Sequence, residues 1–438
     1  MSLLSEKEAK EILEKALSYS KADECEVSLE DEISGNVRYA RNTVTTSGAA
    51  ETLSLQIQSS LGQRSGSTSI NEFDTASLEK AVQRSEELAR MAPENPEYMP
   101  FLPPQIYQPT AAYFSSTADL RPADRAQAAG KSILPCRQKN LVAAGFLSNR
   151  TGFSARMNSH GLFGFHPSTS VDFSLTVRTP DGTGSGYVQR DYNDVAKLNT
   201  ASASAIAINK AIQSREPKAI EPGKYTVILE PSASVGLLSN MMRSFAARSA
   251  DEGRSFLSKT GGGTRKGEKM FDERVTITSN PAHPEIPSSP WAGDGRPQFP
   301  VTWIDKGEVK HMYYSRYWAK KNDTQAIPPP AGFVMAGGED SIDDMIRDTR
   351  RGVLVTRTWY IRSVDPQTLL YTGLTRDGTF YIKDGRIEHP VKNFRFNESP
   401  VIMLNNIERI GRPQRIRGNL VPTLKIRDFT FSSLSDAI

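Results

Sequence analysis

Residues 25–30 read Cys-Glu-Val-Ser-Leu-Glu, so apolar and polar side chains alternate along this stretch. A period of two points successive side chains to opposite faces, which predicts a β-strand with one buried face. The same alternation recurs at 37–41 and 51–58, and residues 61–66 are typical of the return strand of a hairpin. We therefore expect four antiparallel strands in this part of the chain.

A helix is expected on each side of these strands. Ser5 precedes an apolar pattern of helical period, and Glu8 follows it at the spacing of a capping box. Asp74 can cap a second helix. The apolar face of that helix comprises Leu78, Ala81, Val82, Leu88 and Ala89. Together these elements form a predicted unit over residues 1–90.

Prolines crowd the segment 91–109, which excludes a helix interior or a central strand and indicates an extended surface connector. Beyond it, over 110–220, the order of helix, strands and helix is repeated, which raises the hypothesis of an internal duplication. The predicted helices are 122–129 and about 194–213. The predicted strands are 141–147, 152–157, 171–177 and 186–189. Turns are predicted between them at 148–152 and 179–182.

The composition changes near 218–223, where a second domain is expected to begin. A strand is predicted at 225–229 and a last long helix at 231–248, and the remainder is strand and loop with a helix only at 341–347. Such a pattern favours a β-rich barrel or sandwich. The predicted fold class is α+β, with these parts: antiparallel sheets flanked by helices over 1–220, and the β-rich domain over 221–438.

Charge and composition exclude several classes of protein. The 438 residues carry 54 Lys and Arg against 50 Asp and Glu, and the net charge of +4 is too small for a nucleic-acid-binding surface. No apolar stretch is long enough to span a membrane, and the first residues lack the pattern of a signal peptide. The two cysteines, Cys25 and Cys136, fit a reducing compartment, so we expect a cytoplasmic protein.

The histidines do not have the spacing of a metal site. The chain contains none of the patterns HExxH, HExxxH or CxxC, and no histidine has another three to five residues away. His160 and His166 lie six residues apart, and we interpret them as strand-end side chains without a ligand role. The other three are His283, His311 and His389. From residue types alone, no metal site is predicted.

Other conspicuous segments have ordinary structural interpretations. The glycines at 261–263 lie in a basic loop that lacks the spacing of a phosphate loop. Trp291 lies in a turn that could contact a ligand or be purely structural. The carboxylates at 339–344 suit a helix start, and no Gly-x-Ser-x-Gly nucleophile motif occurs. Packing explains an aromatic group with near-helical spacing, Tyr313, Tyr314, Tyr317 and Trp318.

Several segments resemble the TldD/PmbA family, also called TldD/TldE or modulator-of-gyrase proteins. They come in the family's order and span nearly the whole chain. In the first half these are 22–29 (ADECEVSL), 37–42 (VRYARN), 61–69 (LGQRSGSTS) and 77–85 (SLEKAVQRS). In the second half they are 227–238 (VILEPSASVGLL), 305–310 (DKGEVK) and 378–392 (GTFYIKDGRIEHPVK).

The resemblance implies a cytoplasmic peptidase built as a heterodimer, in which the TldD-type subunit holds zinc with HExxxH on a helix and a Cys near the C-terminus. At the corresponding positions this chain has Ser239, Asn240 and Ser244, and the Cys position falls around Arg417-Gly418. None of these side chains is a useful zinc ligand, and Asn240 cannot act as a general base. The resemblance therefore implies a TldE/PmbA-type subunit without catalytic residues, metal ligands or a cofactor of its own.

Two functional hypotheses follow. In the first, the chain pairs with a zinc-bearing TldD-type subunit and helps it act on unfolded or modified peptides. In the second, it is a stand-alone homodimeric peptide-binding or scaffold protein without peptidase activity. A hydrolase that uses His160, His166 or Asp172 ranks last, since their spacing is not that of a site. The sequence leaves open the substrate, the partner, the choice of homodimer or heterodimer, and a metal held by residues distant in sequence.

Overall fold

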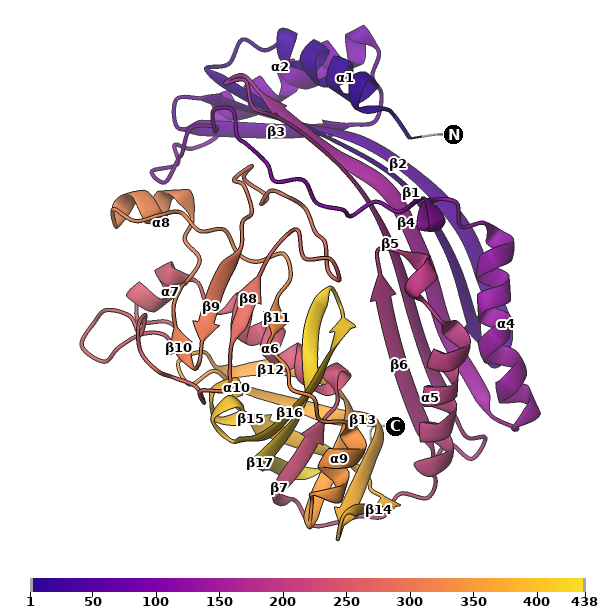
Figure 1. Cartoon of the computed structure of the whole chain (residues 1–438). Helices are drawn as coiled ribbons and strands as arrows, with labels where there is room; N and C mark the ends of the chain where they lie inside the picture. Colours follow the sequence, from indigo (N-terminus) through magenta and orange to yellow (C-terminus); the bar gives the residue numbers. More distant parts are fainter. Residues whose placement is uncertain (1–2, 436–438) are drawn as a thin grey trace.

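The computed structural model describes residues 3–435 and contains two sheets, one built from residues 24–192 and the other from residues 223–435. Figure 1 shows the first as an arch of long strands and the second as a more compact part on its inner side. This confirms the α+β class, with antiparallel strands and flanking helices in the first half and a β-rich second half. The domain boundary at about residue 220 stays a prediction.

The first sheet has six strands in the order β3-β2-β1-β4-β5-β6, and each neighbouring pair is antiparallel. Their bounds are β1 Glu24–Ala40, β2 Thr43–Leu61, β3 Arg64–Ile70, β4 Val142–Asn158, β5 Phe163–Arg178 and β6 Ser185–Tyr192. The predicted hairpin is confirmed, because β2 and β3 pair across a turn at Gly62. The two units predicted at 1–90 and 110–220 share this sheet, since β1 pairs with β4 along most of its length.

The strands are longer than their local patterns predict. The segments predicted at 25–30 and 37–41 are both parts of β1, so the first unit has three strands and not four. The turn predicted at 148–152 is wrong, because β4 runs straight through it. Those residues pair with β1 on one side and β5 on the other, and Asn149 accepts a hydrogen bond from Arg125 Nη1 at 2.9 Å. Pairing on both sides thus overrides the turn preference of the residues.

Helices cover one face of this sheet at its two ends. The odd-numbered residues of β1 face them: Cys25, Val27 and Leu29 at one end, Val37 and Tyr39 at the other. The first end is covered by α1 (Glu6–Ser18) and α2 (Thr75–Met91), the second by α4 (Pro122–Gln138) and α5 (Thr200–Gln213). Figure 1 shows these helices on the outer side of the arch. The inner face is left for the second part of the molecule.

The capping residues were predicted correctly, whereas two helix bounds were not. Ser5 and Glu8 form the predicted capping box, and Asp74 accepts hydrogen bonds from the first turn of α2. The helix predicted at 122–129 extends to Gln138. The helix predicted from about 194 is a short 3₁₀ turn, η1 (Val195–Lys197), followed by α5, because Asn199 caps a new helix start. The connector, 92–114, has no regular structure before the short helix α3 (Ser115–Ala118), as predicted.

In the second part, five strands close into a ring. β7 (Gly223–Leu229) pairs with β12 (Arg351–Asp365), β12 with β13 (Leu370–Lys383), and β13 with β15 (Asn393–Glu398). β15 pairs with β17 (Asn419–Ser435), which pairs back to β7 and completes a barrel. The further strands are β8 Ile277–Ser279, β9 Val301–Asp305, β10 Glu308–Val309, β11 Val334–Met335, β14 Arg386–Pro390 and β16 Ile407–Ile416.

This part also contains more helix than predicted. The helix predicted at 231–248 is divided into α6 (Pro231–Arg243) and α7 (Ala247–Asp251), because Ser244 ends the first. The helix predicted at 341–347 is confirmed as α9 (Ile342–Arg347), with Ser341 as its cap. Two short helices were not predicted, α8 Arg316–Lys321 and α10 Pro400–Asn405. No helix within residues 3–435 has the length and apolar character needed to cross a membrane.

Candidate functional site

A cavity of about 490 Å³ lies between α6, β12, the loop 329–333 and the turn from β16 to β17. We call it the α6 cavity. The side of α6 that lines it carries Ser232, Gly236, Ser239, Asn240 and Arg243, which recur at helical spacing. Other side chains of the helix are buried in the hydrophobic core of the barrel: Val235, Leu237, Leu238 and Met241. The amphipathic pattern of α6 thus fixes which residues reach the cavity.

A bulge in β12 forms the opposite wall. In a regular strand successive side chains alternate between faces, yet all four residues from Thr358 to Ile361 line the cavity. The pairing with β13 shifts between Trp359 and Arg362, and Tyr360 has a φ of 54°. A bulge of this kind re-aims the side chains of a strand. The Thr358 hydroxyl also donates to the Ala233 carbonyl at 2.6 Å, which ties the bulge to α6.

The third wall is a tight turn that the first sheet holds in place. Arg417 and Gly418 have φ angles of 50° and 69°, the left-handed pair required by a two-residue hairpin of type I′. Asp191, on β6, accepts hydrogen bonds from Arg417 N at 2.6 Å, Gly418 N at 2.8 Å and Arg415 Nε at 3.0 Å. We call these contacts the Asp191 clamp. They fix the position of Arg417 relative to the rest of the cavity.

Three of the four positions that resemble the family's zinc motif meet in this cavity. Ser239, Asn240 and Arg417 all line it, although Arg417 is far from the other two in the sequence. Ser244 does not line it but stands at the end of α6, where its hydroxyl donates to the Asn240 carbonyl at 3.0 Å. The structure therefore brings together a hydroxyl, an amide and a guanidinium.

These groups do not fit zinc, which proteins bind through Cys, His and carboxylate side chains. Arg417 would place a second positive charge beside the metal ion. Over the described part of the chain, no three His, Cys, Asp or Glu side chains are grouped so as to hold a metal ion.

The cavity is positively charged. Arg243 donates to Asn240 Oδ1, and Arg417 Nε donates to Gln189 Oε1 at 3.2 Å. Both partners are neutral, and within residues 3–435 neither guanidinium has a carboxylate at salt-bridge distance. The lining contains no Asp or Glu. Both arginines are exposed, and guanidinium groups form strong charge-assisted hydrogen bonds with carboxylates, so this arrangement suits a negatively charged ligand.

The histidines and Asp172 have separate structural partners. His160 contacts Glu24 Oε1 at 3.0 Å and the Phe101 carbonyl at 3.2 Å, which fastens the connector to β1. His166 packs edge-on against Trp291, and burial lowers its pKa to about 4. Asp172 lies on β5 opposite Asp191, and burial, followed by the charge of Asp191, raises its pKa. These contacts describe three separate environments and not one constellation.

The other conspicuous segments are structural. Trp291 is buried against Tyr107 of the connector, with ring centroids 4.8 Å apart. Trp318 belongs to the barrel core, and Tyr313, Tyr314 and Tyr317 pack against it, as predicted. The loop 261–263 has three glycines with positive φ.

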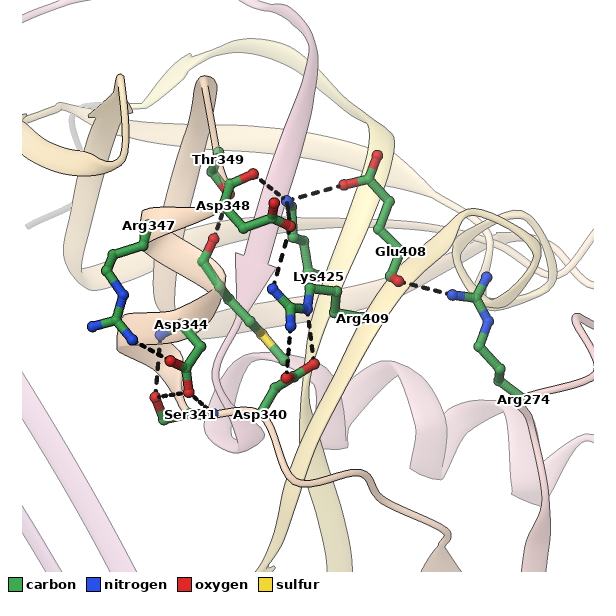
Figure 2. Close-up of polar contacts among 11 residues, drawn as sticks. Arg274, Asp340, Ser341, Asp344, Arg347, Asp348, Thr349, Glu408, Arg409 and Lys425 are labelled. Carbon is green, nitrogen blue, oxygen red and sulfur yellow. Dashed lines mark hydrogen bonds and ion pairs between the residues drawn. The ribbon is translucent and has the colours of Figure 1, made fainter.

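The carboxylates near 339–344 belong to a polar network that fastens α9 to the barrel. Asp344 completes the capping box of Ser341, and Asp340 accepts two hydrogen bonds from Arg409, at 2.8 Å each (Figure 2). Lys425 of β17 bonds to Asp348, the residue that ends α9, at 3.0 Å, and this contact lowers the pKa of Asp348. The interpretation of these carboxylates as part of a helix start is confirmed.

Sequence reasoning missed the other side chains of the α6 cavity. Arg243 is one helical turn beyond Ser239, and this spacing could have indicated it. Trp359 and Tyr360 had no signal, because nothing in the local pattern marks the bulge that turns them to the same cavity. Asp191 had none either, since its partners come from the other sheet.

Comparison with known proteins relates the fold to one family. The C-terminal domain of the PmbA/TldA metallopeptidases matches residues 222–433, and their domain 1 matches residues 25–89. The protein called metalloprotease PmbA from Escherichia coli O157:H7 is 22% identical over 466 residues, covering 97% of this chain and 98% of that protein.

Two solved structures have the same fold. The crystal structure of TldE from Thermococcus kodakarensis superposes with a TM-score of 0.86 at 17% identity, over 97% of this chain and 99% of that one. A structure from Thermotoga maritima gives a TM-score of 0.87 at 16% identity, over 97% and 100%.

Proposed function

Since the chain belongs to the PmbA/TldD family of metallopeptidase-like proteins, we propose that it is the TldE/PmbA-type, non-catalytic subunit of a two-component peptidase. A TldD-type partner would supply the zinc and the catalytic groups. This chain would help to hold an unfolded or modified peptide for that partner, in the cytoplasm.

The α6 cavity is the observation that carries the proposal. Three of the four positions that resemble the zinc motif meet there, and their side chains are those of Ser239, Asn240 and Arg417. These side chains can bind a ligand through hydrogen bonds and charge but cannot activate water through zinc. A cavity that has binding groups without metal ligands supports a role in holding the substrate.

The edge of β12 offers a way to hold an extended peptide. β7 pairs with β12 only from Gly352 to Val355, and within residues 3–435 no other strand pairs with β12 on that side. Beyond Val355, β12 lies against α6 and then reaches the bulge at the α6 cavity. An extended peptide can bind such an edge by adding a strand to the sheet. The geometry therefore supports a peptide as the ligand.

Co-expression with a TldD-type protein that carries HExxxH tests this proposal. We expect the two chains to co-elute in size-exclusion chromatography, and the mixture to cleave an unfolded peptide faster than either chain alone. Replacing the motif glutamate of the partner by Gln should abolish cleavage but leave co-elution intact, because that residue belongs to the chemistry and not to the assembly.

Two outcomes would contradict the proposal. One is cleavage by this chain alone at the rate of the mixture. The other is a chain that never co-elutes with the partner, is homodimeric by light scattering and leaves the partner's rate unchanged, which favours the stand-alone hypothesis.

A further inference from the structure

The α6 cavity differs in charge from four other cavities of the molecule. Each of those has at least one carboxylate in its lining, for example Asp377 in one and Glu230 in another. The α6 cavity has two guanidinium groups, those of Arg243 and Arg417, and no carboxylate. No acidic side chain in the lining therefore neutralises the positive charge of these two guanidinium groups.

Several hydrogen-bond donors in the cavity also lack an acceptor. Arg243 donates a hydrogen bond to the side-chain oxygen of Asn240, and the amide nitrogen of Asn240 has no acceptor within residues 3–435. Within the described residues, the Ser239 hydroxyl and the indole nitrogen of Trp359 also donate to no acceptor. A cavity with many donors and few acceptors is complementary to an oxyanion, because a carboxylate is an acceptor at both of its oxygens.

An exposed aromatic surface adjoins these donors. Trp359 and Tyr360 are 40% and 54% exposed, which is unusual for side chains of their size. Arg376 lies 4.4 Å from the ring centroid of Trp359, and Arg362 lies 4.5 Å from that of Tyr360. Tyr360 has a left-handed backbone, which is costly for a non-glycine residue and is typical of functional positions. The rings can cover the apolar part of a ligand whose charged end enters the cavity.

We propose that the α6 cavity is a recognition site for a peptide carboxylate. Arg243 and Arg417 bind the carboxylate oxygens, Ser239 and Asn240 donate further hydrogen bonds, and Trp359 and Tyr360 contact the neighbouring residue of the peptide. The inference rests on the proposed role of the chain in holding peptides, and it specifies the chemical feature that is held. A terminal α-carboxylate and an acidic side chain share this chemistry.

The test is a binding measurement on the full chain without any partner, by fluorescence anisotropy. Three labelled ten-residue peptides of one unfolded sequence are compared: a free C-terminal acid, the C-terminal amide, and the amide with one internal Gln replaced by Glu. We expect a peptide with the added carboxylate to bind about tenfold or more tightly than the plain amide. The preference should decrease with added salt.

Variants connect the preference to the cavity. Arg243→Gln and Arg417→Gln, singly and combined, should reduce the preference for a carboxylate, and the double variant should bind the acid and the amide equally. Arg350→Gln is the matched control, because Arg350 is also exposed but does not line the cavity. It should keep the full preference. Circular dichroism and thermal melting establish that each variant is folded.

The result distinguishes the two carboxylate sources and is independent of the partner. Tight binding of the acid alone assigns the site to the peptide C-terminus, and tight binding of the Glu peptide alone assigns it to an acidic side chain. Equal binding of all three peptides, no binding at millimolar concentration, or a preference that survives in the double variant would overturn the inference. Because this assay has no TldD-type chain, failure of the partnership would leave its outcome unaffected.

Discussion

Replacing Asp191 by Asn should weaken the connection between the two sheets. The carboxylate is 6% exposed and accepts three hydrogen bonds, from Arg417 N, Gly418 N and Arg415 Nε. An amide of the same shape has one acceptor oxygen, so its NH₂ group must face a donor. Arg415 retains hydrogen bonds to the Asn193 side chain, at 2.8 Å, and to the Glu285 carbonyl.

The magnitude follows from these contacts. A hydrogen bond to a charged group contributes about 1.5–3 kcal/mol, and breaking a buried charge pair costs about 3–5 kcal/mol. The amide oxygen keeps part of the interaction with the turn, and Asn193 keeps part of that with Arg415. We therefore expect Asp191→Asn to lower the free energy of unfolding by about 2–4 kcal/mol.

Urea unfolding measures this loss with two probes. All four tryptophans lie between residues 291 and 359, so fluorescence reports on the second part, whereas far-UV circular dichroism reports on both. The variant should show a lower urea midpoint and transitions that separate between the probes, because the clamp couples the two parts. Glu339→Gln is the control, since Glu339 is 90% exposed and its pair with Arg412 should contribute little. A midpoint for Asp191→Asn equal to that of the control would refute this explanation of the clamp.

Two further predictions concern stability. His166 has a pKa of about 4 in the folded chain against 6.5 unfolded, so the unfolded state takes up the extra proton between these pH values. Stability should thus fall by about 2–4 kcal/mol as the pH is lowered from 6.5 to 4, and His166→Phe should remove that part of the pH dependence; an unchanged profile in urea titrations would contradict this. Gly186→Ala should destabilise the chain, because a Cβ there would lie 2.1 Å from the Ala207 carbonyl oxygen of α5. Gly130→Ala, in α4 with open space around it, should raise the melting temperature through about 0.5–1 kcal/mol of helix propensity; opposite shifts for the two alanines are the expected result.

Local signals in the sequence predicted the elements that local chemistry determines. The capping box of Ser5 and Glu8 begins α1, and the alternation of residues 25–30 forms the start of β1. The turn predicted at 148–152 was wrong because those residues pair with a strand on each side. Their partners in β1 lie 112 or more residues away in the sequence, and their other partners are in the next strand, β5. Non-local pairing is not visible in a window of a few residues.

The candidate site shows the same division. Ser239, Asn240 and Arg417 were found through the family resemblance, and the structure places them at one cavity. Tyr360 and Asp191 were missed because one depends on a bulge and the other on a contact between sheets. The family resemblance thus indicated the positions, whereas the positive charge and the aromatic surface around them became visible only in the three-dimensional structure.

The closure of the barrel has a consequence for the order of events during synthesis. β7 needs β17 as its second neighbour, and β17 is made after every other strand of the ring. The six-stranded sheet uses residues up to Tyr192 and can pair while the ribosome is still adding the second half. β7 must therefore wait with both edges open until β12 emerges, and with one edge open until β17 emerges, and contacts of such long range fold slowly. During that interval the nascent chain exposes an unpaired, apolar strand, the kind of segment that chaperones bind.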